Sequence, residues 1–252
     1  MGLAAEGIAI GLFARSSSQL DEVSAEIAAG GGTAIALTGD VTDEGAVRSA
    51  AKRTEEELGP VTLLVNNAGT CQAVGPLWEI SQDEWWGEVA VHIRGAALCC
   101  QVMLPSMIAR GEGRVINVYG DLGDSGGRYC SAYAVGKAGM LRLTDHLAAE
   151  TADVGVKVFA LHPGFVHTPM IDALSREPRS RKWLPQFSNL AQDRFLDPAN
   201  TTRVALAIAD GKLDRLSGRY VGAWEDIREI QRRSQEISDK DLRTLRLRDD
   251  TQ

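Results

Sequence analysis

A strand-to-helix junction spans residues 118–140, has the sequence VYGDLGDSGGRYCSAYAVGKAGM and opens a long amphipathic run. It places Tyr133 four residues before Lys137, about one helical turn, so the two side chains share a face. A free phenol titrates near pH 10, but an ammonium group beside it favours the phenolate, so such a pair can transfer a proton near neutral pH. The junction predicts either a general acid/base or a helix N-terminus that carries an incidental Tyr and Lys.

Apolar strands and periodic helices alternate on both sides of this junction, and the strands are continuously apolar, which is typical of parallel strands buried on both faces. The alternation predicts an α/β fold with a doubly wound, Rossmann-like parallel sheet flanked by helices in a single domain. The strands are expected at residues 8–13, 33–37, 61–65, 114–119, 157–161 and 218–222. The helices are expected at residues 18–29, 43–58, 82–109, 133–154 and 197–210.

Four motifs in the chain resemble, in the same order, those of the short-chain dehydrogenase/reductase family, and the resemblance covers nearly the whole sequence. They are Asp40-Val41 for the acidic turn on the adenine side, Asn66-Asn67-Ala68-Gly69 for NNAG, Tyr133-Ala-Val-Gly-Lys137 for YxxxK, and Pro163-Gly-Phe-Val-His-Thr168 for the PG-x-V-x-T segment. The resemblance implies a dinucleotide-binding domain at residues 1–223. Residues 224–252, charged and helical in pattern, would form an extension that packs on its own domain or on a subunit partner.

The resemblance also implies the roles of individual residues. Tyr133 would be the acid/base, and Lys137 would lower its pKa and hold ribose hydroxyls. The Val166 backbone and the Thr168 side chain would lie near the carboxamide of nicotinamide. The residues expected to bind the cofactor are Arg15, Asp40, Val41, Asn67, Ala68, Gly69, Tyr133, Lys137, Pro163, Gly164, Val166 and Thr168.

Arg15 follows the strand expected at residues 8–13 and bears on the choice of cofactor. At the end of the second strand of such folds an acidic residue binds the ribose hydroxyls of NAD, whereas an arginine suits the 2′-phosphate of NADP. Arg15 therefore favours NADP(H) over NAD(H), unless it is a solvated loop cation. Asp40 either reaches the adenine amino group or caps its own loop.

Two positions depart from the family pattern on the catalytic side. His92 stands where the family has an asparagine that extends a proton relay from the lysine; a histidine could also relay protons, or could be a hydrogen-bonded core residue. Gly120 stands where the family has a serine that donates to the substrate carbonyl. Ser125, Tyr119 or Tyr129 could replace that donor, although Ser125 fits a turn better.

A third departure lies at the amino terminus, where only a few residues precede the strand expected at 8–13. By resemblance a first strand and a glycine-rich turn, whose backbone N–H groups hold the pyrophosphate, would come before it. We expect either a misplaced start or a truncated chain, in which cofactor binding is in doubt. A sheet without that strand would leave buried backbone groups unpaired.

Composition limits the remaining possibilities. The net charge of −7 and the pI near 5.2 argue against nucleic-acid binding. No apolar run approaches 18 residues and no signal peptide is evident, so we expect a cytoplasmic protein without a membrane span. The four cysteines, Cys71, Cys99, Cys100 and Cys130, lack metal-site spacing and are interpreted as reduced core thiols.

The resemblance implies an oxidoreductase that transfers hydride between NADP(H) and a small-molecule carbonyl or alcohol. The alternative is a non-redox or non-catalytic homologue: a partner subunit of an active relative, or a cyclase or dehydratase that reuses the pocket. The expected helices 82–109 and 133–154 would build a homodimer or homotetramer, or a hetero-oligomer with an active relative. Residues 170–197 resemble a variable lid, whose cations could attract an anionic substrate or form a solvated face.

Overall fold

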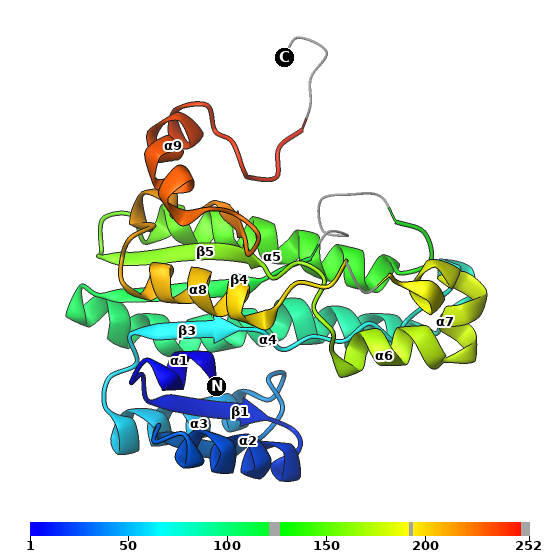
Figure 1. Ribbon diagram of the computed structural model, residues 1–252, viewed down its shortest axis with the longest axis horizontal. Helices are drawn as coiled ribbons and strands as arrows, with labels where there is room; N and C mark the ends of the chain where they lie inside the picture. Colours follow the sequence, from blue (N-terminus) through cyan, green and yellow to red (C-terminus); the bar gives the residue numbers. More distant parts are fainter. Residues whose placement is uncertain (121–126, 192–193, 248–252) are drawn as a thin grey trace.

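The computed structural model describes residues 1–120, 127–191 and 194–247, and over them the chain is a parallel α/β fold in a single domain. Its strands lie in two groups (Figure 1). The first pairs β1 (Ile10–Ala14) with β2 (Ala34–Thr38). The second has the order β3 (Leu63–Asn66), β4 (Gly113–Val118), β5 (Val156–His162) and β6 (Tyr220–Gly222). Every pairing is parallel, so the predicted fold class is confirmed.

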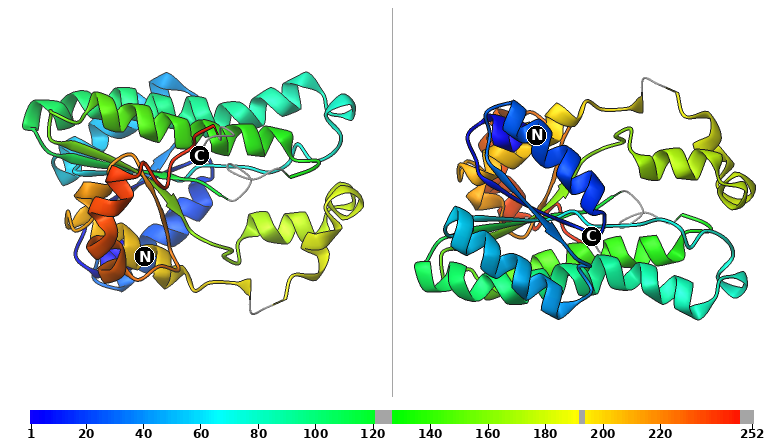
Figure 2. Two further views of the ribbon diagram at one scale, coloured as in Figure 1. Left: turned by 90° about the horizontal axis from the view of Figure 1, so that it is seen from above. Right: turned by 90° about the horizontal axis from the view of Figure 1, so that it is seen from below.

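Helices cover both faces of the strands (Figure 2). One face carries α3 (Glu44–Leu58), α4 (Gln82–Arg110) and α5 (Ser131–Glu150). The other carries α2 (Ser17–Ala29), α8 (Pro198–Ala209) and α9 (Ile227–Asp239). The short helices are α1 (Gly2–Ala5), α6 (Pro169–Arg176) and α7 (Pro178–Trp183), and the 3-10 turns are η1 (Leu77–Glu79), η3 (Pro185–Asn189) and η5 (Asp214–Leu216).

Polar caps fix where most of the long helices begin. Ser16, Asp43, Ser81, Asp197 and Asp226 each accept a hydrogen bond from a backbone N–H of the first turn, which would otherwise have no partner. The observed bounds agree with the expected ones to within a few residues. Among the helices expected with stated bounds, the largest shift is at α5, which starts two residues earlier and ends four residues earlier than the 133–154 run. In the tail, which was expected to be helical over residues 224–252, the described helix is α9 and ends at Asp239.

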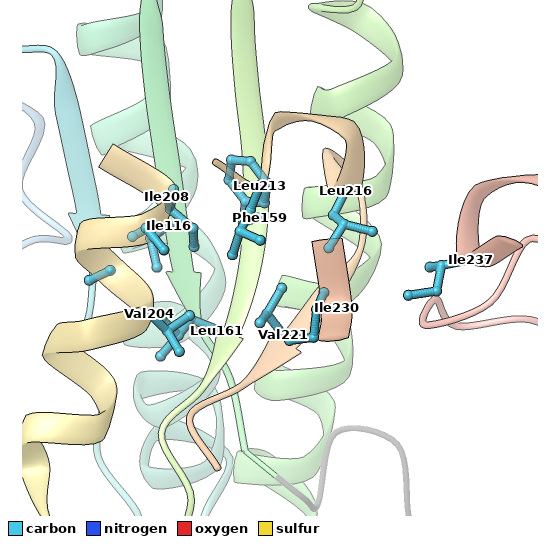
Figure 3. Packing of buried hydrophobic residues seen from close by; sticks show 12 residues of the cluster. Ile116, Phe159, Leu161, Val204, Ile208, Leu213, Leu216, Val221, Ile230 and Ile237 are labelled. Carbon is cyan, nitrogen blue, oxygen red and sulfur yellow. The ribbon is translucent and has the colours of Figure 1, made fainter. Parts of the chain in front are cut away.

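Successive core side chains of β4 and β5 point alternately to the two faces of the sheet. Val115 and Val158 pack toward α4, whereas Ile116 and Phe159 pack toward α8 and α9 (Figure 3). All four are at most 1% exposed. Because side chains alternate along a strand and helices cover both faces, each strand must be apolar at every position.

The charged tail packs on its own chain. Ile230 and Ile237 of α9 are 3% and 0% exposed and join the core beside β6. After α9, Arg246 Nη1 lies 2.6 Å from Asp145 Oδ2 of α5, and Arg246 Nε lies 2.6 Å from Asp241 Oδ2. These contacts agree with packing on its own domain, while the division at residue 223 stays a prediction.

α4 is, among the described residues, the one helix long and apolar enough to cross a membrane by composition alone. Core helices of soluble proteins meet the same criterion. Here the helix packs along α5, β3 and β4, and Cys100, Met103 and Met107 are at most 5% exposed.

A cavity of about 750 Å³ separates the two strand groups, and we call it the interstrand cavity. β1 lines one side and β3 the other, and no strand lies between them among the described residues. Val65, in the middle of β3, is 40% exposed as a result. The cavity continues to the carboxyl ends of these strands, where Arg15 and Gly69 line it.

Candidate active site

The first turns of α5 place Tyr133 beside Lys137. Lys137 is 4% exposed, and its Nζ lies 5.5 Å from the centre of the Tyr133 ring. The ammonium group donates to the carbonyl oxygen of Val118 at 2.8 Å, which fixes it at the end of β4. Burial lowers the pKa of Lys137 to about 8. The structure thus brings together the two residues that the sequence pairs as acid/base and pKa modifier.

Gly120 lies directly beside the phenol. A Cβ atom at this position would be 2.8 Å from the hydroxyl oxygen of Tyr133, closer than real Cβ contacts. The Tyr133 hydroxyl therefore occupies the space that a side chain at position 120 would need. The position expected for the hydroxyl donor is next to the reacting oxygen, but it carries no side chain.

The other possible hydroxyl donors lie elsewhere or are not described. The Tyr119 ring packs edge-on against His162, with centroids 5.0 Å apart, and is 2% exposed. The Tyr129 ring packs against Trp183 at 4.8 Å. Ser125 lies outside the described residues. Tyr129 and Tyr133 pack against the same buried cluster, and replacement of the missing donor by Tyr119 or Tyr129 stays a prediction.

His92, from the middle of α4, reaches the same place and is fully buried. Its ring meets the Tyr133 ring edge-on, with centroids 5.3 Å apart, and its Nε2 lies 2.8 Å from the carbonyl oxygen of Thr70. Because a carbonyl only accepts, Nε2 must carry the proton, and Nδ1 is left as an acceptor. Nδ1 is buried and has no hydrogen-bond partner.

Electrostatics keep His92 neutral. Burial, and then the charge of Lys137, lower the pKa of His92 to about 4. A Cβ at Gly69 would lie 3.3 Å from Nδ1 of His92 and 3.6 Å from Nζ of Lys137, so both nitrogens border the same small space. The two interpretations of this histidine are thus combined: it is a hydrogen-bonded core residue, and its free acceptor faces the catalytic lysine.

Glu88 is a site residue that the sequence did not reveal. It lies one helical turn before His92, is 4% exposed, and its Oε2 accepts from the backbone N–H groups of Gln72 and Ala73 at 2.6 and 2.9 Å. Burial raises the pKa of this carboxyl. The carboxylate holds the segment that follows Gly69, and its i, i+4 spacing from His92 was the only signal in the sequence.

Asn66 is structural, whereas the next three residues of the motif line the cavity. Asn66 Nδ2 donates to Asn117 Oδ1 at 2.8 Å, and Asn117 Nδ2 donates to Thr144 Oγ1 at 2.9 Å. This chain of hydrogen bonds ties β3 to β4 and to α5. The cavity wall then includes Asn67, Ala68 and Gly69.

Arg15, Asp40 and Val41 line the interstrand cavity at the carboxyl ends of β1 and β2. The Arg15 side chain is 75% exposed, and its Nη1 lies 3.9 Å from Asp40 Oδ2. Asp40 Oδ1 accepts from the backbone N–H and the hydroxyl of Thr42, and these bonds lower its pKa. Asp40 therefore caps its own loop, as one of its two interpretations predicted. Arg15 keeps an exposed guanidinium at the cavity mouth, beside Asp40.

The segment after β5 is near the site but does not line the interstrand cavity. Gly164 has φ +73°, and Leu196 occupies the space where a Cβ would be. Thr168 Oγ1 accepts from the backbone N–H of Ile171 at 3.4 Å and caps α6. Pro163 and Val166 belong to the same turn, and the cavity wall includes none of them. Their expected contacts with nicotinamide stay a prediction.

Two of the lid cations bind their own chain. Arg179 forms an ion pair with Glu84 at the start of α4, and Lys182 Nζ lies 4.3 Å from the centre of the Trp183 ring. These contacts favour the solvated or structural interpretation of the lid charges over attraction of an anionic substrate.

Sequence and structure comparisons agree with this geometry. A family model described as short chain dehydrogenase matches residues 1–179. The oxidoreductase UcpA of Escherichia coli K12 is 32% identical over 209 residues, covering 80% of this chain and 78% of that protein. The short chain dehydrogenase mpl6 of Monascus purpureus is 33% identical over 213 residues, covering 84% and 69%.

A crystal structure of a gluconate 5-dehydrogenase from Burkholderia cenocepacia in complex with NADP and tartrate is also similar. It superposes with a TM-score of 0.76 at 26% identity, covering 88% of this chain and 86% of that one. The matched family model spans the YxxxK and NNAG segments, of which Lys137 and Gly69 border the same small space. This chain belongs to the short-chain dehydrogenase/reductase family.

Proposed function

We propose that this chain is an oxidoreductase that transfers hydride between NADP(H) and a small-molecule carbonyl or alcohol. The observation that carries the proposal is the buried Lys137 ammonium group, held 5.5 Å from the Tyr133 ring centre. Family membership supports the same reaction class, and the Burkholderia relative was crystallised with NADP.

The described residues fit the two ends of such a cofactor. Arg15 offers an exposed guanidinium for a 2′-phosphate, next to Asp40 at the cavity mouth. At the other end, Gly69 lacks a Cβ where one would contact His92 and crowd Lys137. Over the described residues, the cavity wall contains no glycine-rich turn for a pyrophosphate. Cofactor binding is accordingly the first step to test.

The proton-transfer chemistry follows from the two side chains on α5. Nicotinamide, when bound, supplies or accepts the hydride. The Tyr133 hydroxyl gives its proton to the carbonyl oxygen, and the nearby Lys137 ammonium stabilises the phenolate that remains. Because Gly120 supplies no hydroxyl, the carbonyl would be polarised by one donor fewer than in the family pattern, a loss of roughly a hundred- to a thousand-fold in rate.

His92 has an orienting role in this scheme. A pKa of about 4 means that the imidazole stays neutral at pH 7, so it does not store the proton. Its Nδ1, which has no hydrogen-bond partner in the protein, would accept a hydrogen bond from the Lys137 ammonium group, directly or through a water beside Gly69, and would add to the hold of the Val118 carbonyl on that group. This is a modified relay, with an acceptor where the family has an asparagine.

The second candidate function is a homologue without redox activity, either a partner subunit of an active relative or a cyclase or dehydratase. The lack of a side chain at Gly120, beside the Tyr133 hydroxyl, favours it. Titration of the purified chain with NADPH and with NADH, followed by calorimetry, tests the main proposal. Binding of NADPH ahead of NADH, and NADPH oxidation with a ketone panel that Tyr133→Phe abolishes, would support it. No binding of either nucleotide would reject it.

A further inference from the structure

Apolar side chains of the lid pack onto the catalytic end of α5. Leu174 of α6 and Leu184, which follows α7, are 4% and 3% exposed and form one buried cluster with Val74 and Cys130. Tyr133 packs against this cluster, which we call the lid cluster. In Figure 1, α6 and α7 lie beyond the carboxyl ends of the strands, at the same end of the molecule as the start of α5. A substrate whose carbonyl reaches the Tyr133 hydroxyl must therefore fit among these side chains or replace them.

An aromatic surface borders the lid cluster. The Trp183 ring lies 4.8 Å from the Tyr129 ring, and both rings pack against the cluster. A Cβ at Gly75 would lie 3.5 Å from Cδ1 of Trp183, so the indole also rests on the backbone there. The backbone N–H of Gly75 donates to the carbonyl oxygen of Tyr129 at 2.7 Å, which joins the two segments that support the indole. The position of this aromatic surface is therefore fixed by the fold.

The thiols in this region indicate that little water reaches it. Cys130 is 2% exposed, and burial raises its pKa to about 11. Burial also raises the pKa of Cys71, a second thiol that packs against the lid cluster. Hydroxyl or carboxylate groups of a substrate placed here would lose their hydrogen bonds to water, and apolar groups would not.

The cations of the lid are held by other partners. Arg179 forms an ion pair with Glu84 of α4, and Lys182 Nζ lies over the Trp183 ring. Arg181 is exposed, and its Nε donates to a backbone carbonyl of α6 at 3.1 Å. Before any of these three cations could bind a substrate carboxylate, its present contact would have to break. The lid is therefore better suited to an apolar substrate than to an anionic one.

We propose that the substrate has an apolar body, either an alkyl chain or an aromatic ring, which packs between Leu174 of the lid and the facing Val74 and Cys130. Its carbonyl carbon takes the hydride of NADPH and its oxygen takes the proton of Tyr133, so that an apolar alcohol and NADP are formed. Ligand pockets are commonly lined by apolar and aromatic side chains, with a few polar groups that orient the ligand. The inference rests on the proposed function, because it takes Tyr133 as the acid/base, and it narrows that function to one class of substrate.

The first test measures binding and needs no turnover. The full chain, with and without NADP, is titrated with acetophenone, tetralone or ketogluconate while the indole N–H signals are followed by NMR, and Trp183→Phe assigns the signal of Trp183. The two apolar ketones should bind saturably and shift this signal, while the signal of Trp86, which is 59% exposed, should not move. Ketogluconate should bind about a hundredfold more weakly or worse, because its polar groups would be left unpaired.

Variants of one lid leucine test whether the apolar wall makes this selection. Leu174→Gln places an amide in the wall and should weaken acetophenone binding about tenfold or more, whereas Leu247→Gln, at a leucine that is 92% exposed, should leave it unchanged. Leu174→Ala keeps the wall apolar but makes it smaller, so it should favour the bulkier tetralone over acetophenone relative to the parent. A general loss of stability would weaken both ketones alike, and melting curves of each variant check that the fold is intact.

Binding and turnover together distinguish this inference from the proposed function. Binding of the apolar ketones with the expected shift, but without NADPH oxidation, would support the apolar site and reject the redox function. Oxidation of NADPH with ketogluconate in preference to the apolar ketones would support the redox function and overturn the apolar substrate class. Shifts of Trp86 alone, equal acetophenone binding by Leu174→Gln and the parent, or binding of none of the ketones would each overturn it as well.

Discussion

Substitutions at position 120 separate two effects on catalysis, which are the crowding of the Tyr133 hydroxyl and the polarisation of the substrate carbonyl by a second hydroxyl. Gly120→Ala adds only the Cβ, which would lie 2.8 Å from the Tyr133 hydroxyl oxygen, and Gly120→Ser adds the same Cβ plus a hydroxyl. Relief of the contact to an ordinary 3.4 Å moves the phenol by about 0.6 Å. At roughly a hundredfold per ångström of misplacement, the alanine variant should lose roughly 15-fold in kcat/KM.

The serine variant should recover far more than this loss. One hydroxyl donor to a developing oxyanion contributes roughly a hundred- to a thousand-fold, or about 2.7–4 kcal/mol. We therefore expect Gly120→Ser to exceed Gly120→Ala by about a hundredfold or more. Because the two variants share the Cβ, their ratio reports the hydroxyl alone.

The assay is steady-state NADPH oxidation with a panel of ketones, after calorimetry has established that the parent and both variants bind NADPH equally. Adding His92→Asn to the serine variant tests whether the asparagine of the family pattern improves the relay further. Equal rates for the serine and alanine variants, with cofactor bound, would refute the proposal that the chain is a reductase slowed by the missing hydroxyl at position 120. They would favour a homologue without redox activity.

Three further outcomes are expected. Arg15→Ala should reduce the preference for NADPH over NADH about ten- to a hundred-fold in calorimetric Kd, because a charge-assisted contact is lost. The control Arg48→Ala, on the exposed side of α3, should leave the preference unchanged. Equal binding of both nucleotides by the parent would exclude this role of Arg15. The pKa of His92 is about 4 in the fold against 6.5 in the unfolded chain, so the contribution of the neutral imidazole to the free energy of unfolding is complete above pH 6.5, and about 3 kcal/mol of it is lost as the pH falls to 4. Urea unfolding at several pH values should show this loss. His92→Asn should flatten the pH dependence, whereas His146→Asn on the surface of α5 should leave it unchanged. Deletion of residues 224–252 should lower the melting temperature, because it exposes core side chains that α9 covers. The preference for NADPH should not change. An unchanged melting curve would mean that the tail contributes nothing to stability.

Much of the fold could be predicted from the sequence, because parallel strands buried on both faces leave a clear apolar pattern. The adjacency of Tyr133 and Lys137 followed from helical spacing alone, and the register that assigned Gly120 to the serine position agrees with its contact to the phenol. These are local relations, in which distance along the chain determines distance in space.

The remaining site depends on contacts between distant segments. Glu88 holds the backbone of residues 72–73 across a loop, and apart from its i, i+4 spacing from His92 nothing in its own helix distinguishes it from a surface acid. Arg179 could be a free lid cation until its pairing with Glu84 is seen. The protonation of His92 likewise required its partner, the Thr70 carbonyl, to be located.

The two halves of the tail, α9 and residues 240–247, are held by different forces and should respond differently to salt. Arg246 is held by Asp145 and Asp241, all partly in water, and about 1 M sodium chloride shortens the range of such attractions to about 3 Å. The isoleucines of α9 are held by apolar burial, which sulfate strengthens. Sodium chloride should therefore loosen residues 240–247 and open them to trypsin while α9 remains docked, and ammonium sulfate should tighten α9. The choice of salt during purification thus selects how much of the carboxyl terminus survives intact.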